Sequence, residues 1–278
     1  MTTEARDGIR VERPRPDVVR VVLARPETRN AQDTRLLYAL DDAYTAAMAD
    51  DAVKVVILAG DGPHFSSGHD LRDRYPMADH QPRSGWGGFD LDAVEGWYAT
   101  ERELYVGLCL RWRDLPKPII AEVHGRVIAA GLMLVWPCDL VVAADDTEFS
   151  DPVVAFGVNG HEYFVHPWEL GHRKAKELLF TGASLDAVEA QQCGMVNQVV
   201  PRDALAAETL HLAERIARRP SLGLKLAKSS VNQALDLQGQ TAAVHAAFSL
   251  HQLGHAHNRK VHGKLIDPAG LDLIRERR

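Results

Sequence analysis

Residues 53–70 read VKVVILAGDGPHFSSGHD and place an apolar, β-branched run directly before a turn of small residues. The run predicts a buried strand. Small residues in the turn allow a backbone N–H to face a cleft with no side chain in the way. Enzymes that form an enolate or transfer an acyl group need such a donor. The stretch therefore predicts one half of an oxyanion-binding site.

A second turn rich in glycine and alanine lies further along the chain, within VHGRVIAAGLMLVWPCDLVVA at residues 123–143. Here too the small residues come directly after an apolar strand. Two such turns, each presenting a backbone N–H, predict a two-donor oxyanion hole that stabilises negative charge on a carbonyl oxygen.

The composition is that of an ordinary globular protein: 278 residues, 46% apolar, 25% charged, with a net charge of −6. The acidic balance and the lack of a basic stripe interleaved with aromatic residues exclude a general nucleic-acid binder. The apolar stretches are too short to span a membrane, and the charged start does not resemble a signal peptide. Three widely spaced cysteines predict reduced core thiols. We therefore expect a cytoplasmic protein without a nucleic-acid or membrane partner.

The first part of the chain predicts alternating strands and helices. Strands are expected at residues 18–23, 54–59, 119–123 and 140–144, and helices at 33–50, 93–113 and from about 130. This alternation implies an α/β core with right-handed crossovers.

Beyond residue 165 the sequence predicts mainly helices. They are expected at 173–180, 184–192, 202–219, 221–237 and 240–257, with a short strand at 195–200. Ser184 is the expected N-cap of its helix, and Gly194 lies just past that helix's end. We divide the chain into a core at 1–200 and a helical region at 201–278, which packs on its own sheet or on another subunit.

Four segments match, in order, the motifs of one enzyme family. They are RPETRNA at 25–31, VKVVILAGDGPHFSSGHDL at 53–71, AEVHGRVIAAGLMLVWPCDLVVAADDTEFSDP at 121–152 and LLFTGASLDAVEAQQCGMVNQVV at 178–200. Together they resemble the crotonase superfamily, the enoyl-CoA hydratase/isomerase family, over nearly the whole chain. A chance match to one motif is common, whereas a match to all four in order is improbable.

The resemblance implies an α/β fold of repeated ββα units in two near-perpendicular sheets, with C-terminal helices that form a homotrimer or hexamer. It implies an acyl-CoA thioester as the small-molecule substrate and no separate cofactor. The thioester oxygen is expected between the backbone N–H groups of His69 and Ala130, and Ala130 is expected to begin a helix. The residues expected to contact the substrate are Arg25 (at the CoA phosphates), Ser67, Gly68, Asp70, Gly131, Met133 and Val153.

The sequence departs from the family pattern at two acid/base positions. Hydratases of the family place one glutamate three residues after the second oxyanion donor and another after the proline of F-x-x-P. Met133 and Val153 stand there in this chain, and neither can move a proton. Glu162, in the later turn GVNGHEYF, is the first candidate for a relocated base, and His69 supplies an imidazole. The alternatives are a solvated or ion-paired Glu162 and a His69 that only fills space.

The sequence therefore predicts an acyl-CoA enzyme that forms an enolate, as an isomerase or as a hydratase with relocated acid/base groups. Two alternatives remain: hydrolysis, dehalogenation or C–C bond chemistry on a CoA thioester, and a non-catalytic acyl-CoA-binding protein.

His251 and His255 lie four residues apart on a predicted helix, a spacing at which two imidazoles can bind zinc. No acid of the H-E-x-x-H kind accompanies them. We therefore expect a polar helix face or a subunit contact, and no metal site.

Overall fold

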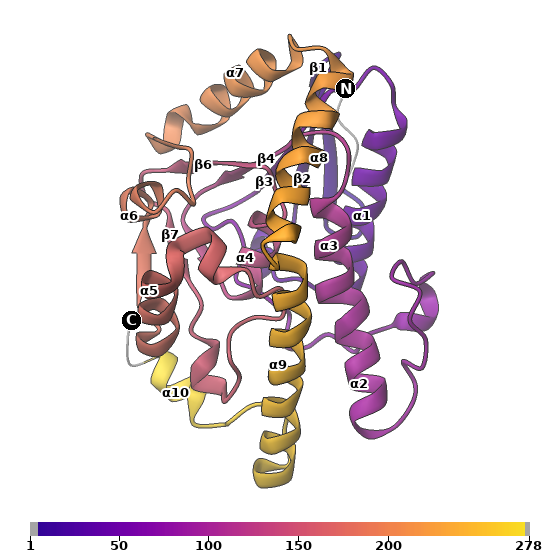
Figure 1. Ribbon diagram of the computed structural model, residues 1–278, viewed down its shortest axis with the longest axis vertical. Coiled ribbons are helices and arrows are strands. Elements are labelled where there is room, and N and C mark those ends of the chain that lie inside the picture. The colour runs from indigo at the N-terminus through magenta and orange to yellow at the C-terminus, as the bar shows by residue number, and fades with distance from the viewer. Residues whose placement is uncertain (1–4, 276–278) are drawn as a thin grey trace.

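Two β-sheets of unequal size lie at the centre of the molecule (Figure 1). The computed structural model describes residues 5–275. The larger sheet has the strand order β1-β2-β3-β4-β6-β9 and the smaller one β5-β7-β8. The strands are β1 (Ile9–Arg15), β2 (Val18–Leu23), β3 (Val55–Gly60), β4 (Ile119–Val123), β5 (Arg126–Ile128), β6 (Leu140–Ala144), β7 (Glu148–Ser150), β8 (Ser184–Asp186) and β9 (Gln198–Val200).

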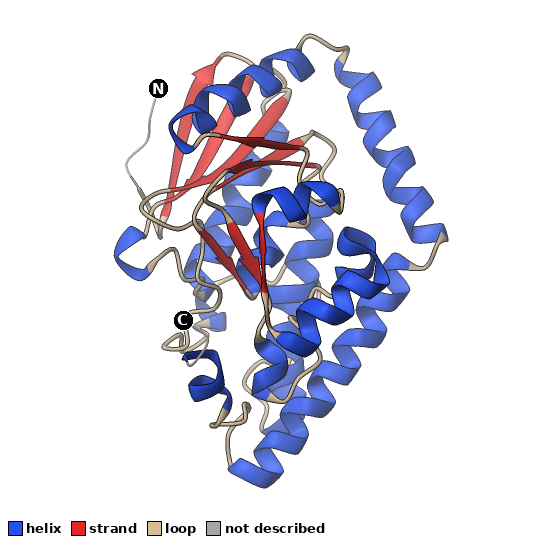
Figure 2. Cartoon of the chain, turned by 90° about the vertical axis from the view of Figure 1, so that its left-hand side faces the viewer, coloured by secondary structure: helices blue, strands red, loops and turns tan. Residues whose placement is uncertain are grey.

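The large sheet is parallel except at one edge, where β1 pairs antiparallel with β2. The parallel pairs require crossover connections, and the expected helices supply them. This confirms the expected alternation of strand and helix. In the small sheet β5 and β7 are parallel and β8 is antiparallel to β7. Figure 2 shows these three short strands beneath the larger sheet.

Helices cover both faces of the large sheet. Successive side chains of a strand point to opposite sides, and in this sheet both sides carry apolar residues that must be buried. On one face Val21 and Leu58 pack with α1 and α3, and on the other Ile57 and Ile120 pack with α7. The α-helices are α1 (Thr34–Ala49), α2 (Ala93–Glu101), α3 (Leu108–Arg113), α4 (Ala130–Val135), α5 (His166–Thr181), α6 (Ala187–Gln192), α7 (Leu205–Ala217), α8 (Ser221–Leu237), α9 (Gln240–His262) and α10 (Gly270–Arg275).

A π-helical segment, Arg102–Gly107, joins α2 to α3. The sequence predicts one unbroken helix over 93–113. The structure confirms helix over this range but divides it into α2, the π-helical segment and α3. Segments of this kind widen a helix locally and are frequent at functional sites. Glu101 and Tyr105, both buried, lie at and inside this segment.

Three of the expected elements differ in the structure. Residues 184–186 are the strand β8 rather than the start of a helix, because Leu185 pairs with Phe149 of β7. The N-cap of α6 is consequently Asp186, whose carboxylate accepts a hydrogen bond from the amide of Glu189, and not Ser184. The helix expected at 173–180 is confirmed as the part of α5 that follows a break at Gly171 (φ 72°, ψ 151°). The strand expected at 195–200 is limited to Gln198–Val200, and the helix expected at 240–257 continues to His262.

The C-terminal helices α8 and α9 run one after the other along the length of the molecule (Figure 1). Helix α8, all of which the structure describes, buries none of its residues. Helix α9, by contrast, buries several side chains against the rest of the chain. Over residues 5–275, no helix combines the length and the apolar character needed to cross a membrane.

Candidate functional site

The two glycine-rich turns meet between the sheets. The turn after β3 is joined to β5 because Ser66 donates from its amide to the carbonyl of Arg126 (3.2 Å) and accepts from the amide of Ile128 (3.1 Å). At Gly68, whose φ is +90°, a Cβ would lie 2.9 Å from the carbonyl oxygen of Ile128 and 3.4 Å from the nitrogen of Ala130. Glycine is therefore required for this close approach.

The backbone at the start of α4 is unusual. Ala129 has φ 48° and ψ −114°, a conformation that costs about 1–3 kcal/mol for a residue with a Cβ. Its amide donates to the carbonyl of Ser150 (2.8 Å), and Gln32 donates from its side chain to the carbonyl of Ala130 (2.8 Å). Within residues 5–275, neither the amide of His69 nor that of Ala130 donates a hydrogen bond to another residue. Both N–H groups are thus left for another acceptor.

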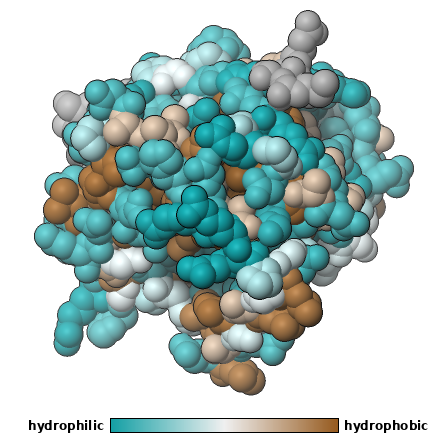
Figure 3. Space-filling model, turned by 90° about the horizontal axis from the view of Figure 1, so that it is seen from above, coloured by the Kyte–Doolittle hydropathy of each residue, from teal (hydrophilic) through white to brown (hydrophobic). Residues whose placement is uncertain are grey.

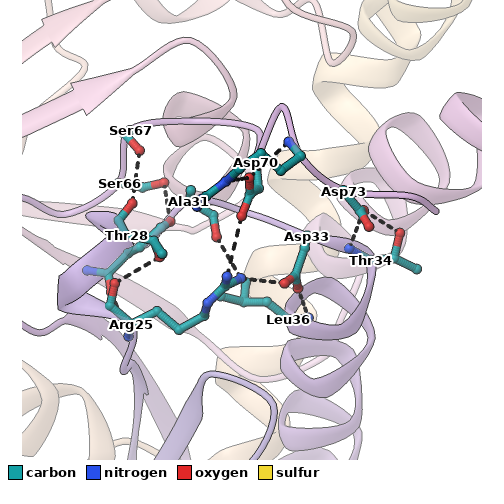
Figure 4. Close-up of polar contacts among 12 residues, drawn as sticks. Arg25, Thr28, Ala31, Asp33, Thr34, Leu36, Ser66, Ser67, Asp70 and Asp73 are labelled. Atoms are coloured by element: carbon teal, nitrogen blue, oxygen red, sulfur yellow. Dashed lines mark hydrogen bonds and ion pairs between the residues drawn. The ribbon is translucent and has the colours of Figure 1, made fainter. Parts of the chain in front are cut away.

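Arg25 and Asp70 hold the first turn against the N-terminal loop (Figure 4). The guanidinium of Arg25 donates to Asp33 (2.5 Å), to the carbonyl of Ala31 (3.2 Å) and to Asp70 (3.4 Å). From the same turn, the Ser67 hydroxyl lies 3.5 Å from the carbonyl of Thr28 in the N-terminal loop. Arg25 thus pairs with the carboxylates of Asp33 and Asp70 and holds this turn in place. Its contact with CoA phosphates stays a prediction.

Met133 and Val153 stand at the two positions where the resemblance predicts glutamates in a hydratase, and both side chains are apolar. Met133 is buried in α4, and Val153 begins a short 3₁₀ turn at Val153–Phe156. Two residues before Met133, Gly131 lies so close to the turn after β3 that a Cβ would meet the carbonyl oxygen of Ser66 at 2.9 Å. Gly131 therefore allows α4 to pack against the first turn, and its contact with substrate stays a prediction.

Glu162 is buried and faces two imidazoles. Its Oε2 lies 3.3 Å from Nε2 of His69 and its Oε1 lies 3.4 Å from Nε2 of His251. Burial disfavours the charged carboxylate, but the imidazoles of His69 and His251 outweigh it and hold the pKa of Glu162 well below its usual range. Glu162 is therefore a carboxylate enclosed by imidazoles and not a solvated one. The ring of His69 also packs on Tyr105, with ring centroids 4.0 Å apart.

Asp151 fixes the turn that carries Glu162. Its Oδ2 accepts a hydrogen bond from the amide of His161 (3.0 Å) and pairs with Nε2 of His166 (2.8 Å). Burial opposes ionisation, yet the hydrogen bond from His166 keeps the pKa of Asp151 below its usual value. Asp151 thus has the turn-stabilising role expected for an aspartate before a proline.

His251 and His255 do not form a polar outer face of α9, which corrects that expectation. Both are buried inside the chain, 3.0 Å apart between their Nε2 atoms. His255 also lies 3.3 Å from Oε1 of Glu101, at the end of α2. The sequence indicated the two histidines through their spacing. It gave no sign of Glu101, because no motif links α2 to α9.

The fold and the two meeting turns define an α/β protein of the crotonase class. The family model for enoyl-CoA hydratase/isomerase matches residues 15–266. The EchA13 protein of Mycobacterium tuberculosis is 47% identical over 253 residues, which cover 88% of this chain and 80% of that protein. The 2,3-dehydroadipyl-CoA hydratase of Escherichia coli is 30% identical over 239 residues, 84% of this chain and 86% of that one.

Solved structures agree with these relatives. A crystal structure from Mycobacterium thermoresistibile, described as a probable enoyl-CoA hydratase, is 47% identical with a TM-score of 0.85. The match covers 93% of this chain and 99% of that one. The chain belongs to the enoyl-CoA hydratase/isomerase family and is an acyl-CoA-processing enzyme of that type.

Proposed function

We propose that this enzyme forms an enolate from an acyl-CoA thioester held by two backbone N–H groups, those of His69 and Ala130. The observation that carries the proposal is the contact of the two turns at Gly68, with both amides free of protein acceptors. Charge develops on the thioester oxygen as the α-proton leaves. Donors that are already oriented stabilise this charge, each by roughly 3 kcal/mol.

The proton is handled by His69 and Glu162 together. The carboxylate stays ionised, so it is too weak a base to keep a proton itself, but it orients the imidazole and stabilises its charged form. Nε2 of His69 faces Glu162, whereas Nδ1 has no hydrogen-bond partner among the described residues. Nδ1 then accepts the α-proton of the thioester and returns it to the product. Met133 and Val153 take no part in this transfer.

Exchange of the α-protons tests this proposal without knowledge of the natural acyl chain. The enzyme is incubated in D₂O with a panel of saturated acyl-CoA esters, and deuterium in the recovered esters is measured by mass spectrometry. We expect incorporation by the native enzyme and a loss of about 10²–10³-fold in Ala130→Pro, which lacks one donor. Thermal melting checks that this variant is folded, since proline also restrains Ala129.

Two results would contradict the proposal. Esters that bind without exchanging any proton would indicate an acyl-CoA-binding protein. Release of free CoA without exchange would indicate a thioester hydrolase. A parallel panel of enoyl- and 3-hydroxyacyl-CoA esters identifies the net reaction.

We further propose that the cytoplasmic form is a homotrimer, or a hexamer made of two trimers. The supporting observation is the apolar surface on α8 and α9, carried by Leu222, Leu226, Val231, Leu237, Leu250, Leu253 and Val261. The space-filling view from above shows apolar patches within a mostly polar exterior (Figure 3). Helix faces of this kind are typical of interfaces. Sedimentation of a monomer at micromolar concentration would exclude this assembly.

A further inference from the structure

We propose that Glu101, Glu162, His251 and His255 bind one divalent transition-metal ion of the Zn²⁺ type. All four side chains are buried, and each offers one ligand atom that lies within 4.8 Å of the other three. Two imidazole nitrogens and two carboxylate oxygens form a donor set suited to Zn²⁺. Mg²⁺ and Ca²⁺, which prefer oxygen ligands alone, fit this set less well.

Three of the six spacings between the ligand atoms match those of a tetrahedral site. Bonds of about 2.0–2.1 Å to a tetrahedral zinc ion place neighbouring ligand atoms about 3.3 Å apart. The two Nε2 atoms of His251 and His255 are 3.0 Å apart. Oε1 of Glu162 lies 3.4 Å from Nε2 of His251, and Oε1 of Glu101 lies 3.3 Å from Nε2 of His255. Three edges of the tetrahedron therefore agree with the expected spacing.

The outer ring nitrogens show which atoms are free to bind a cation. Nδ1 of His251 lies 2.8 Å from the carbonyl oxygen of Gly160, and Nδ1 of His255 lies 2.7 Å from that of Leu265. A carbonyl only accepts, so each Nδ1 carries the hydrogen, and each Nε2 faces into the cluster, where its lone pair could bind a metal ion. Metal-binding histidines usually have this arrangement, with the far nitrogen donating to a carbonyl.

Each carboxylate is also oriented by a side chain outside the cluster. Oε2 of Glu101 accepts a hydrogen bond from the side chain of Gln252, and Oε2 of Glu162 faces His69. Each acid is left with Oε1 toward the two imidazoles. Two buried carboxylates need positive charge near them, because an uncompensated buried charge is strongly unfavourable. A divalent cation supplies this charge at the point where the four atoms converge.

The ligands come from three separate parts of the chain. Glu101 ends α2, Glu162 lies in the turn before α5, and both histidines belong to α9. Four protein ligands leave no position for water, which is typical of a structural rather than a catalytic zinc site. The ion would therefore fasten α9 over the site and fix Glu162 with Oε2 toward His69.

Metal content tests the site directly. The full-length protein is purified without chelator or affinity metal, and bound metals are measured by mass spectrometry. We expect close to one equivalent of zinc per chain in the native protein and in His257→Ala, a control at an exposed position of the same helix. His255→Ala and the milder Glu101→Gln should each lose most of it.

Cobalt substitution and thermal melting guard against misfolded variants. After removal of metal with a chelator, Co²⁺ should give the visible absorption band of a tetrahedral N/O site, and Zn²⁺ should raise the Tm of the native protein but not of Glu101→Gln. Native protein that carries no metal, gives no cobalt band and melts at the same temperature with and without Zn²⁺ would overturn the proposal. These measurements do not depend on acyl-CoA turnover, so the metal site and the proposed reaction can fail separately.

Discussion

Nε2 of His69 lies 3.3 Å from Oε2 of Glu162, although 93 positions separate the two residues in the sequence. The first residue belongs to the turn after β3, and its amide is one of the two proposed oxyanion donors. The second belongs to a turn that Asp151 stabilises by accepting a hydrogen bond from the amide of His161. An imidazole oriented by a carboxylate is a common proton carrier. We therefore propose that this pair supplies the acid/base chemistry for which Met133 and Val153 are unsuited.

The first prediction concerns hydration of crotonyl-CoA, the short enoyl-CoA substrate. With Met133 and Val153 in the glutamate positions, we expect this activity to be weak or absent. Whatever acyl-CoA activity the enzyme has should fall by about 10²–10⁴-fold in His69→Ala, which keeps the backbone N–H but removes the imidazole. Glu162→Gln should reduce it as well, because glutamine cannot carry the negative charge.

The matched control for this prediction is Glu177→Gln, which neutralises an exposed carboxylate on α5. Its activity should equal that of the native enzyme in the same steady-state assay. Rapid hydration of crotonyl-CoA that is unchanged in both His69→Ala and Glu162→Gln would show that the proton is carried by other groups.

The second prediction concerns the contact between the two turns. In Gly68→Ala the new Cβ would lie 2.9 Å from the carbonyl oxygen of Ile128, so the turns must separate by several tenths of an ångström. The two proposed oxyanion donors would then no longer converge, and we expect α-proton exchange to fall at least 10²-fold. Gly85→Ala is the control, because Gly85 also has a positive φ (+76°) but no atom within 4 Å of the added Cβ. Equal exchange rates in the two variants would argue against the contact at Gly68.

The long elements of the fold could be predicted from the sequence because their signals are local. The strand at residues 18–23 and the helix at 33–50 each show a clear apolar period, and both appear within one residue of the predicted ends. The small sheet could not be predicted in this way. Its strands have three residues each, and they exist because Phe149 pairs with Val127 on one side and Leu185 on the other.

Some residues of the candidate site could likewise be predicted from local sequence signals, and others could not. The turn motifs indicated His69, Ala130 and Glu162 because their residue types and spacing are properties of the sequence. Glu101 and His255 could not be joined to them, because their approach depends on how α2 and α9 pack in three dimensions. A buried cluster assembled from three distant segments has no sequence period.

The third prediction concerns the strained backbone before α4. Ala129 has φ 48° and ψ −114°, which glycine adopts without steric cost. Ala129→Gly should therefore raise the free energy of unfolding by about 0.5–1 kcal/mol, since relief of strain exceeds the added entropy of the unfolded chain. Ala46→Gly, at an exposed position of α1, should instead lower it by up to about 1 kcal/mol. Urea unfolding of both variants measures the difference, and a loss of stability in both would show that Ala129 is not strained.

The fourth prediction concerns the dependence of stability on pH. Glu122 of β4 is buried and pairs with Arg20, while its Oε2 has no partner among the described residues. Burial raises the pKa of Glu122 above its ordinary value, and Arg20 only partly offsets this. The folded protein thus binds a proton more tightly at Glu122 than the unfolded chain does. This residue's contribution to stability is complete below the unfolded pKa of about 4.5 and is lost as pH rises through the folded pKa.

Glu122→Gln removes this titration and keeps the size of the side chain. The difference in unfolding free energy between native protein and variant should therefore shift in favour of the variant as pH rises from about 4.5 toward neutrality. The shift amounts to about 1.4 kcal/mol for each unit by which the folded pKa is raised. Urea unfolding at a series of pH values measures the two curves, and Glu177→Gln, at an exposed carboxylate, is the control. A difference that stays constant, or that moves toward the native protein as pH rises, would mean that Arg20 outweighs the burial of Glu122.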